Sequence, residues 1–81
     1  MRERPQNIAR KLRVIRGHLG VSQNGMTQLL NFKVESGRIS DYELGKRQPN
    51  LLTLLAYARV AKIPLEQIID DHMELKFDAP A

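Results

Sequence analysis

Apolar residues recur along the chain at spacings of three and four, which is the period of an amphipathic helix. The first such stripe consists of Ile8, Leu12, Ile15 and Leu19. The pattern predicts helices over about 6–18, 22–30, 36–44, 50–62 and 64–69, without strands. The expected inward residues of the later helices are Met26, Leu29, Leu30, Ile39, Tyr42, Leu51, Leu54, Leu55, Ala58, Ala61, Leu65, Ile68 and Ile69. We therefore expect an all-α fold, a compact bundle of five short helices.

Capping and turn residues mark the ends of these helices. Pro5 suits the start of the first helix, where a missing N–H costs nothing, and Gly20 follows its end. Gly45 is the expected stop of the third helix. A side-chain oxygen that can accept from the free amides of a first turn is provided before the second, third and fourth helices by Ser22, Ser36 and Asn50.

The composition narrows the class of protein. With 81 residues, 42% of them hydrophobic and 27% charged, the chain is long enough for one small soluble domain. It has no cysteine, so disulfides and thiolate chemistry are excluded. No apolar run approaches the ~20 residues of a membrane span, and the basic opening residues lack the apolar stretch of a secretory signal. The expected location is the cytoplasm.

The net charge of +4 is distributed unevenly. Residues 1–20 carry six Arg and Lys against one Glu, the middle third is nearly balanced, and residues 51–81 carry three cations against five acids. A basic N-terminal segment of this kind is typical of a surface that binds a polyanion, but charges that cluster on a solvated helix face would give the same pattern.

The segment from Ser22 to Pro49 holds two short helices joined by a turn, the arrangement of a helix-turn-helix. Its sequence SQNGMTQLL, followed by GRISDYELGKRQPNLLTLLAYA, resembles the Xre/Cro family of phage-repressor-type DNA-binding domains. The resemblance covers roughly residues 7–70, and ISDYELGKRQPNLLTLL is its most specific part. It implies that the helices predicted at 22–30 and 36–44 form a helix-turn-helix, the second of them entering the major groove of DNA.

The resemblance also implies roles for individual residues. The base-reading positions would be Ser36, Gly37 and Asp41, with Arg38 and Ser40 beside them. The phosphate contacts would come from Gln23, Lys46 and Arg47, and Gln48 and Asn50 could add neutral ones. Lys33, in the turn, is a further candidate for a phosphate contact, which its charge and not the family pattern suggests. Glu43 would pair with Arg16 and fix the third helix against the first. Two plainer interpretations stay open: Asp41 could pair locally with Arg38, and Lys46 and Arg47 could simply offset the helix dipole.

The sequence departs from the family pattern in three places. The turn between the two helices, Asn31 to Glu35, is two residues longer than usual, so that Phe32 and Lys33 look inserted, although Val34 can still enter the core. Thr27 is bulkier than the small residue usual in the middle of the second helix. Glu35 takes the usual N-cap position, where a carboxylate close to the DNA backbone is unfavourable.

A second interface is expected in the C-terminal part of the chain, away from the predicted helix-turn-helix. The chain has more apolar residues there than one small core holds, and the candidates for a dimer interface are Leu52, Tyr57, Val60, Ile69, Leu75 and Phe77. We expect a DNA-binding domain over residues 1–71 and a C-terminal tail over 72–81 that is partly ordered or takes part in dimerisation.

These expectations combine into a sequence-specific transcriptional regulator, a repressor that binds a pseudo-palindromic operator on double-stranded DNA as a homodimer. The alternative is an antitoxin-like or other protein-interaction module in which DNA binding is secondary.

Other chemistries find little support. His18 and His72 are far apart and lack a third metal ligand, and the acidic residues Asp70, Asp71 and Glu74 fit a solvated face better than a cation site. No phosphate-binding loop or catalytic set of Ser, His and Asp is found, so we expect no enzyme activity, metal or cofactor. The basic first helix could suit a membrane surface, but its apolar stripe is needed for the core.

Overall fold

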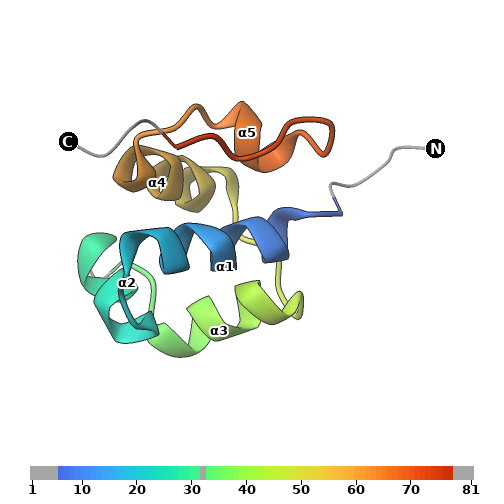
Figure 1. Ribbon diagram of the computed structural model, residues 1–81. Helices are drawn as coiled ribbons and strands as arrows, with labels where there is room; N and C mark the ends of the chain where they lie inside the picture. The colour runs from blue at the N-terminus through green and yellow to red at the C-terminus, as the bar shows by residue number, and fades with distance from the viewer. Residues whose placement is uncertain (1–5, 32, 78–81) are drawn as a thin grey trace.

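Five helices make up the fold of the computed structural model, which describes residues 6–31 and 33–77. They are α1 (Ile8–Leu19), α2 (Gln23–Leu29), α3 (Ser36–Leu44), α4 (Leu51–Ala61) and α5 (Glu66–Ile69) (Figure 1). The described residues contain no strand, so the expected all-α class and the five helices are confirmed. The expectations for Pro5, for Phe32 and for residues 78–81 fall outside the described part of the chain.

The central helix is α1, with α3 on one side of it and α4 and α5 on the other (Figure 1). The core is formed by Ile8, Leu12, Ile15, Met26, Leu30, Val34, Ile39, Tyr42, Leu54, Tyr57, Ala58, Ala61, Ile63 and Ile68. The predicted inward positions Leu29 and Leu51 are wrong, because these side chains are 41% and 62% exposed. Both residues lie at helix ends. The helical period predicts which side of a helix faces the core, but it does not predict whether a neighbouring helix is long enough to cover the end residues.

The helix ends follow the predicted caps with one exception. The Ser22 Oγ accepts from the Gly25 amide at 3.0 Å, and the Asn50 Oδ1 accepts from the Thr53 amide at 2.8 Å. Gly45 ends α3 in the left-handed conformation, with φ of 77°. Ser36 is not a cap: it is the first residue of α3, whose extended N-cap residue is Glu35, and the Glu35 side chain makes no cap hydrogen bond.

The long linker between α2 and α3 is accommodated by backbone conformation. Asn31 adopts φ of 59°, a left-handed conformation that asparagine tolerates better than most residues. Val34 is buried in the core, as expected. Thr27 is half-buried, and its hydroxyl donates to the Gln23 carbonyl at 3.2 Å. The described linker residues and the bulkier Thr27 are therefore compatible with the packing of α2 against α3.

Lys11 lies in the interior, which the sequence did not predict. Its side chain is fully buried, and Nζ donates to the carbonyls of Gln67 at 2.7 Å, Asp70 at 2.9 Å and Met73 at 2.8 Å. Three acceptors match the three hydrogens of an ammonium group, so the charged form fills the site, although burial lowers the pKa of Lys11. Lys11 therefore does not belong to the basic outer surface.

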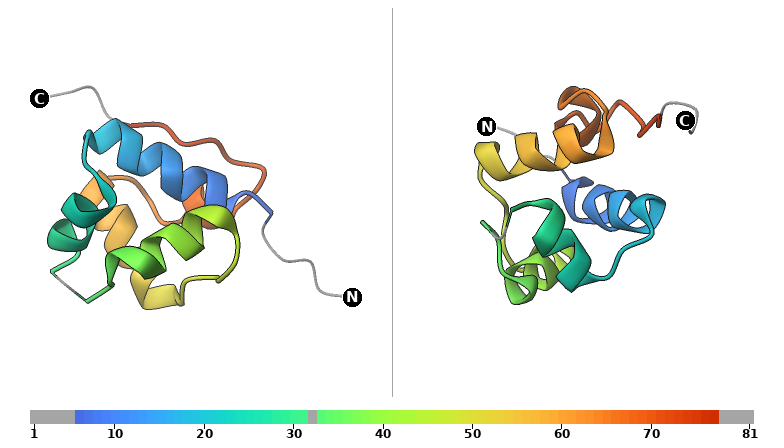
Figure 2. Two further views of the ribbon diagram at one scale, coloured as in Figure 1. Left: turned by 90° about the horizontal axis from the view of Figure 1, so that it is seen from below. Right: turned by 90° about the vertical axis from the view of Figure 1, so that its left-hand side faces the viewer.

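The chain after α5 runs back along α1 (Figure 1, Figure 2). Asp71 accepts from the amides of Gln6 at 2.7 Å and Asn7 at 3.1 Å, and so caps α1 from the far end of the sequence. These two hydrogen bonds lower the pKa of Asp71. Farther on, the Phe77 ring stacks on His18 with ring centroids 3.8 Å apart. Residues 72–77 are thus an ordered part of the fold, and Asp71 is not merely a solvated acid.

Candidate nucleic-acid interface

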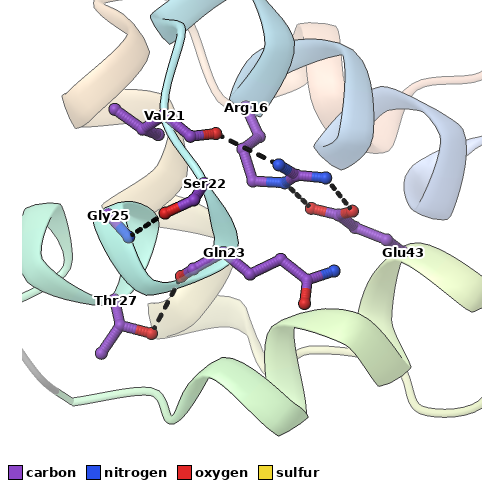
Figure 3. A network of polar contacts seen from close by, with 7 residues as sticks. All are labelled: Arg16, Val21, Ser22, Gln23, Gly25, Thr27 and Glu43. Atoms are coloured by element: carbon purple, nitrogen blue, oxygen red, sulfur yellow. Dashed lines mark hydrogen bonds and ion pairs between the residues drawn. The ribbon is translucent and has the colours of Figure 1, made fainter.

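The Arg16–Glu43 ion pair fixes α3 against α1 (Figure 3). Arg16 Nε lies 2.7 Å from Glu43 Oε2, and Nη2 lies 3.0 Å from Oε1, so the pair is bidentate. Arg16 Nη1 also donates to the Val21 carbonyl at 3.1 Å, just before α2. The predicted structural ion pair is confirmed, and it joins α1, α3 and the entry to α2 at one guanidinium group.

This pair is shielded from solvent, because only 5% of the Glu43 side chain is exposed. The hydrogen bonding that Arg16 donates to Glu43 raises the pKa of Arg16, so the guanidinium stays charged. A buried carboxylate without its partner is costly, which makes the relative placement of α1 and α3 rigid. Each of the three guanidinium nitrogens donates a hydrogen bond, and 23% of the Arg16 side chain is exposed.

The face of α3 opposite the core is made of short side chains. Ile39, Tyr42 and Glu43 point inward, whereas Gly37, Ser40 and Asp41 lie on the outward side. Ser36 is half-buried at the first turn. No heavy atom lies within 4 Å of the position that a Cβ on Gly37 would take, among the surroundings that the structure describes. The outward face is therefore open, and a flat surface could approach the α3 backbone closely.

Arg38 lies on one flank of α3. It is exposed, and it lines a hollow together with Lys33, Glu35 and Asn50. The local ion pair between Asp41 and Arg38, the plainer interpretation of Asp41, is not found. Asp41 instead pairs with Arg47, with 3.5 Å between Oδ2 and Nε.

The loop after α3 brings the next two cations close to its C-terminal end. The amides of Lys46 and Arg47 donate to the Asp41 carbonyl at 2.9 and 3.4 Å, so the chain folds back over the last turn. Both side chains are exposed. They lie at the negative end of the helix dipole, as the plainer interpretation expects, yet they also face solvent beside the outward face of α3.

Gln23 stands in the first turn of α2. It is half-buried, and Figure 3 shows its side chain extending toward α3 beside the Arg16–Glu43 pair. Asn50, in contrast, uses its side-chain oxygen as the cap of α4, so this oxygen is not free for another contact. Gln48 and Lys33 are exposed.

Sequence reasoning missed Leu44. This side chain is 62% exposed and lies on the outward face of α3, one turn beyond Ser40 and Asp41. Its spacing of seven from Gly37 could have placed it there. Apolar contact is thus part of what the outward face of α3 presents.

The residues expected to form a dimer interface do not form one patch. Tyr57 is a correction: it lies on the inner side of α4, three residues after Leu54, and is fully buried. Burial raises its pKa, and its hydroxyl has no hydrogen-bond partner among the described residues. Leu52 is 75% exposed, and Val60 is half-buried on the same helix. Ile69, Leu75 and Phe77 are half-buried in and after α5, where they pack against the core.

Residues 6–31 and 33–77 contain neither a metal-binding cluster nor a membrane-spanning helix. No group of three His, Asp or Glu side chains is placed to hold a metal ion there. None of the helices combines the length and the apolar character needed to cross a bilayer.

The geometry thus provides a rigidly held helix with an open outer face, bordered by exposed cations. Comparison of the chain with family models, with curated proteins and with solved structures finds no match.

Proposed function

We propose that this protein is a sequence-specific DNA-binding regulator in which α2 and α3 act as a helix-turn-helix and α3 enters the major groove. The observation that carries the proposal is the open outward face of α3, locked to α1 by the Arg16–Glu43 pair and bordered by Lys46 and Arg47. A recognition helix must be rigid, accessible and flanked by phosphate-binding groups, and α3 satisfies each condition.

The base-reading residues are those on α3, namely Ser36, Gly37, Arg38, Ser40 and Asp41. Arg38 can take guanine O6 and N7, and Asp41 can accept from cytosine N4. Asp41 first has to leave Arg47, but an exposed pair at 3.5 Å is worth little and is replaced when Arg47 meets a phosphate. Gln23 and Lys46 complete the backbone contacts.

The protein binds as a homodimer in this proposal, since one module of this size buries little DNA surface. The two-fold contact is made by the part of the molecule after α4, where Ile69, Leu75 and Phe77 are half-exposed. Two α3 helices then read half-sites about 10 base pairs apart. Occupancy of such an operator represses transcription by blocking access to it.

The test begins with selection from a random pool of DNA duplexes, followed by binding titrations against salt. Arg38→Ala is expected to change the preferred sequence and to lose about 1–3 kcal/mol at one base position. Arg47→Ala is expected to weaken binding to every sequence and to reduce the slope of log K against log salt by about 1.

Arg13→Ala is the matched control, because Arg13 is an exposed cation of α1, outside both the proposed DNA contacts and the proposed dimer contact. Its binding should equal that of the unmodified protein. If folded protein enriches no sequence from the pool, or if Arg13→Ala weakens binding as much as Arg47→Ala, the proposal is wrong.

A further inference from the structure

An apolar groove lies between the end of α2 and α4, with a volume of about 500 Å³. Its apolar lining consists chiefly of Leu29, Leu52, Leu55, Ala56 and Val60. Leu29 and Leu52 are among the few large apolar side chains that the described residues leave exposed. Such a concentration of apolar surface beside a hollow marks a place where a partner can complete the burial.

The charge of the groove has a single sign. Lys33 and Arg59 are the charged residues among those described that line it, and both are exposed. No ion pair is found for either of them within residues 6–31 and 33–77. The nearest carboxylate in the linker, Glu35, lines the adjoining hollow together with Arg38. The groove therefore offers an apolar floor between two cations that carboxylates could neutralise.

This charge decides between two occupants. A second copy of the chain docked by two-fold symmetry would bring two sets of Lys33 and Arg59 to one apolar seam, which like-charge repulsion opposes. A partner with carboxylates beside an apolar stripe complements both features. A groove bounded by helices is suited to the apolar face of another helix.

We propose that this groove binds an amphipathic helix of another protein, with leucine-like residues on one face and Asp or Glu on the flanks. The surface is separate from the outward face of α3, and Ile69, Leu75 and Phe77 do not line it. Lys33 and Asn50, which are candidate phosphate contacts, also line the groove. Peptide binding is therefore measured without DNA, so that it can fail or succeed independently of DNA binding and of dimerisation.

The test uses two synthetic peptides of about 15 residues, long enough for a few helical turns, with leucines spaced three and four apart. One peptide carries Glu at the flanking positions and the other carries Lys. In fluorescence anisotropy, the Glu peptide is expected to bind at least about tenfold more tightly, equivalent to about 1.4 kcal/mol. The double variant Lys33→Glu/Arg59→Glu is expected to reverse this preference.

Arg13→Glu is the control for charge, since Arg13 is exposed on α1 and does not line the groove. Leu52→Glu should abolish binding of the Glu peptide while leaving the melting curve and the solution mass unchanged. Equal affinity for both peptides, or binding of neither, would falsify the proposal. So would a fall in solution mass caused by Leu52→Glu, because the groove would then hold a second copy.

Discussion

At the scale of single residues, two charged side chains of α1 make contacts inside the fold, and only one of these contacts was predictable from the sequence. Arg16 has a side-chain partner, Glu43, and both stand at positions that the family resemblance pairs. Lys11 is one helical turn earlier, and its acceptors are main-chain carbonyls 56 to 62 residues away. Every residue has a carbonyl, so nothing in the sequence marks those of Gln67, Asp70 and Met73 as ligands. The position of Lys11 on the helix, next to the buried Leu12, was the only signal.

Replacing Lys11 tests the cost of that buried contact. Lys11→Met keeps the length of the side chain and removes the ammonium group, which leaves the Gln67 carbonyl buried without its donor. We expect the free energy of unfolding to fall by about 2–3 kcal/mol. Urea denaturation followed by circular dichroism measures the change.

Lys76→Met is the matched control, because Lys76 is exposed and its side chain is not in this contact. It should change the unfolding free energy by less than about 0.5 kcal/mol. Equal stability of the two variants would show that the Lys11 contacts contribute nothing.

At the scale of the elements, the helices and most of their ends were predictable because local chemistry sets them. The N-caps of α2 and α4 are side-chain hydrogen bonds from the first turn to Ser22 and Asn50, and α3 ends at Gly45 in a left-handed conformation. These are the roles that Ser, Asn and Gly have at the ends of helices in general. The cap of α3 was not predictable in this way: Ser36 is the better capping residue type, yet Glu35 takes the N-cap position and Ser36 begins the helix. How the helices lie against one another depends on contacts distant in sequence, of which the Arg16–Glu43 pair is the clearest.

A double-mutant cycle on this pair measures how strongly α1 and α3 are joined. Arg16→Met leaves the Glu43 carboxylate buried and unpaired, and we expect it to cost about 3 kcal/mol of stability. Glu43→Gln in the same background should then cost less than it does alone, with a coupling energy of at least about 1 kcal/mol. Arg13→Met, at an exposed position of α1, should not couple to Glu43→Gln. Additive effects of Arg16→Met and Glu43→Gln would contradict a structural role for the pair.

At the scale of the whole molecule, the periodicity of apolar residues predicts the all-α class. It does not predict the contacts that join residues 71–77 to α1. The sequence led us to regard Asp71 as part of a solvated acidic cluster and Phe77 as part of a dimer interface. In the structure, Asp71 caps α1 and Phe77 stacks on His18. Pairing between distant segments is set by three-dimensional complementarity, which neither period nor composition encodes. The candidate DNA-binding residues were located by resemblance, and their exposure came from the structure.

The cap that the Asp71 carboxylate provides at the start of α1 predicts that the stability of the fold depends on pH. The amides of Gln6 and Asn7 lower the pKa of Asp71 in the folded state below its unfolded value of about 3.9. The group therefore stabilises the fold above about pH 4, and this contribution is lost as the pH falls through the folded pKa. Asp71→Asn should lower the unfolding free energy near neutral pH and leave it nearly unchanged once the pH is below the folded pKa, where the Asp71 carboxyl is protonated in both states.

Urea titrations at several pH values measure this difference. Glu74→Gln is the control, because it removes an exposed carboxylate of the same segment. A constant gap between Asp71→Asn and the unmodified protein at every pH would show that the cap acts without its charge.

The ammonium of Lys11 has a consequence for how the protein is made. The ribosome releases α1, α2 and α3 well before residues 67–73, which supply the three carbonyls that Lys11 needs. Until then, the segment that covers Lys11 is missing, so water can solvate the ammonium group and this part of α1 stays open. The face of α1 that holds Lys11 is therefore completed only when residues 67–73 are present.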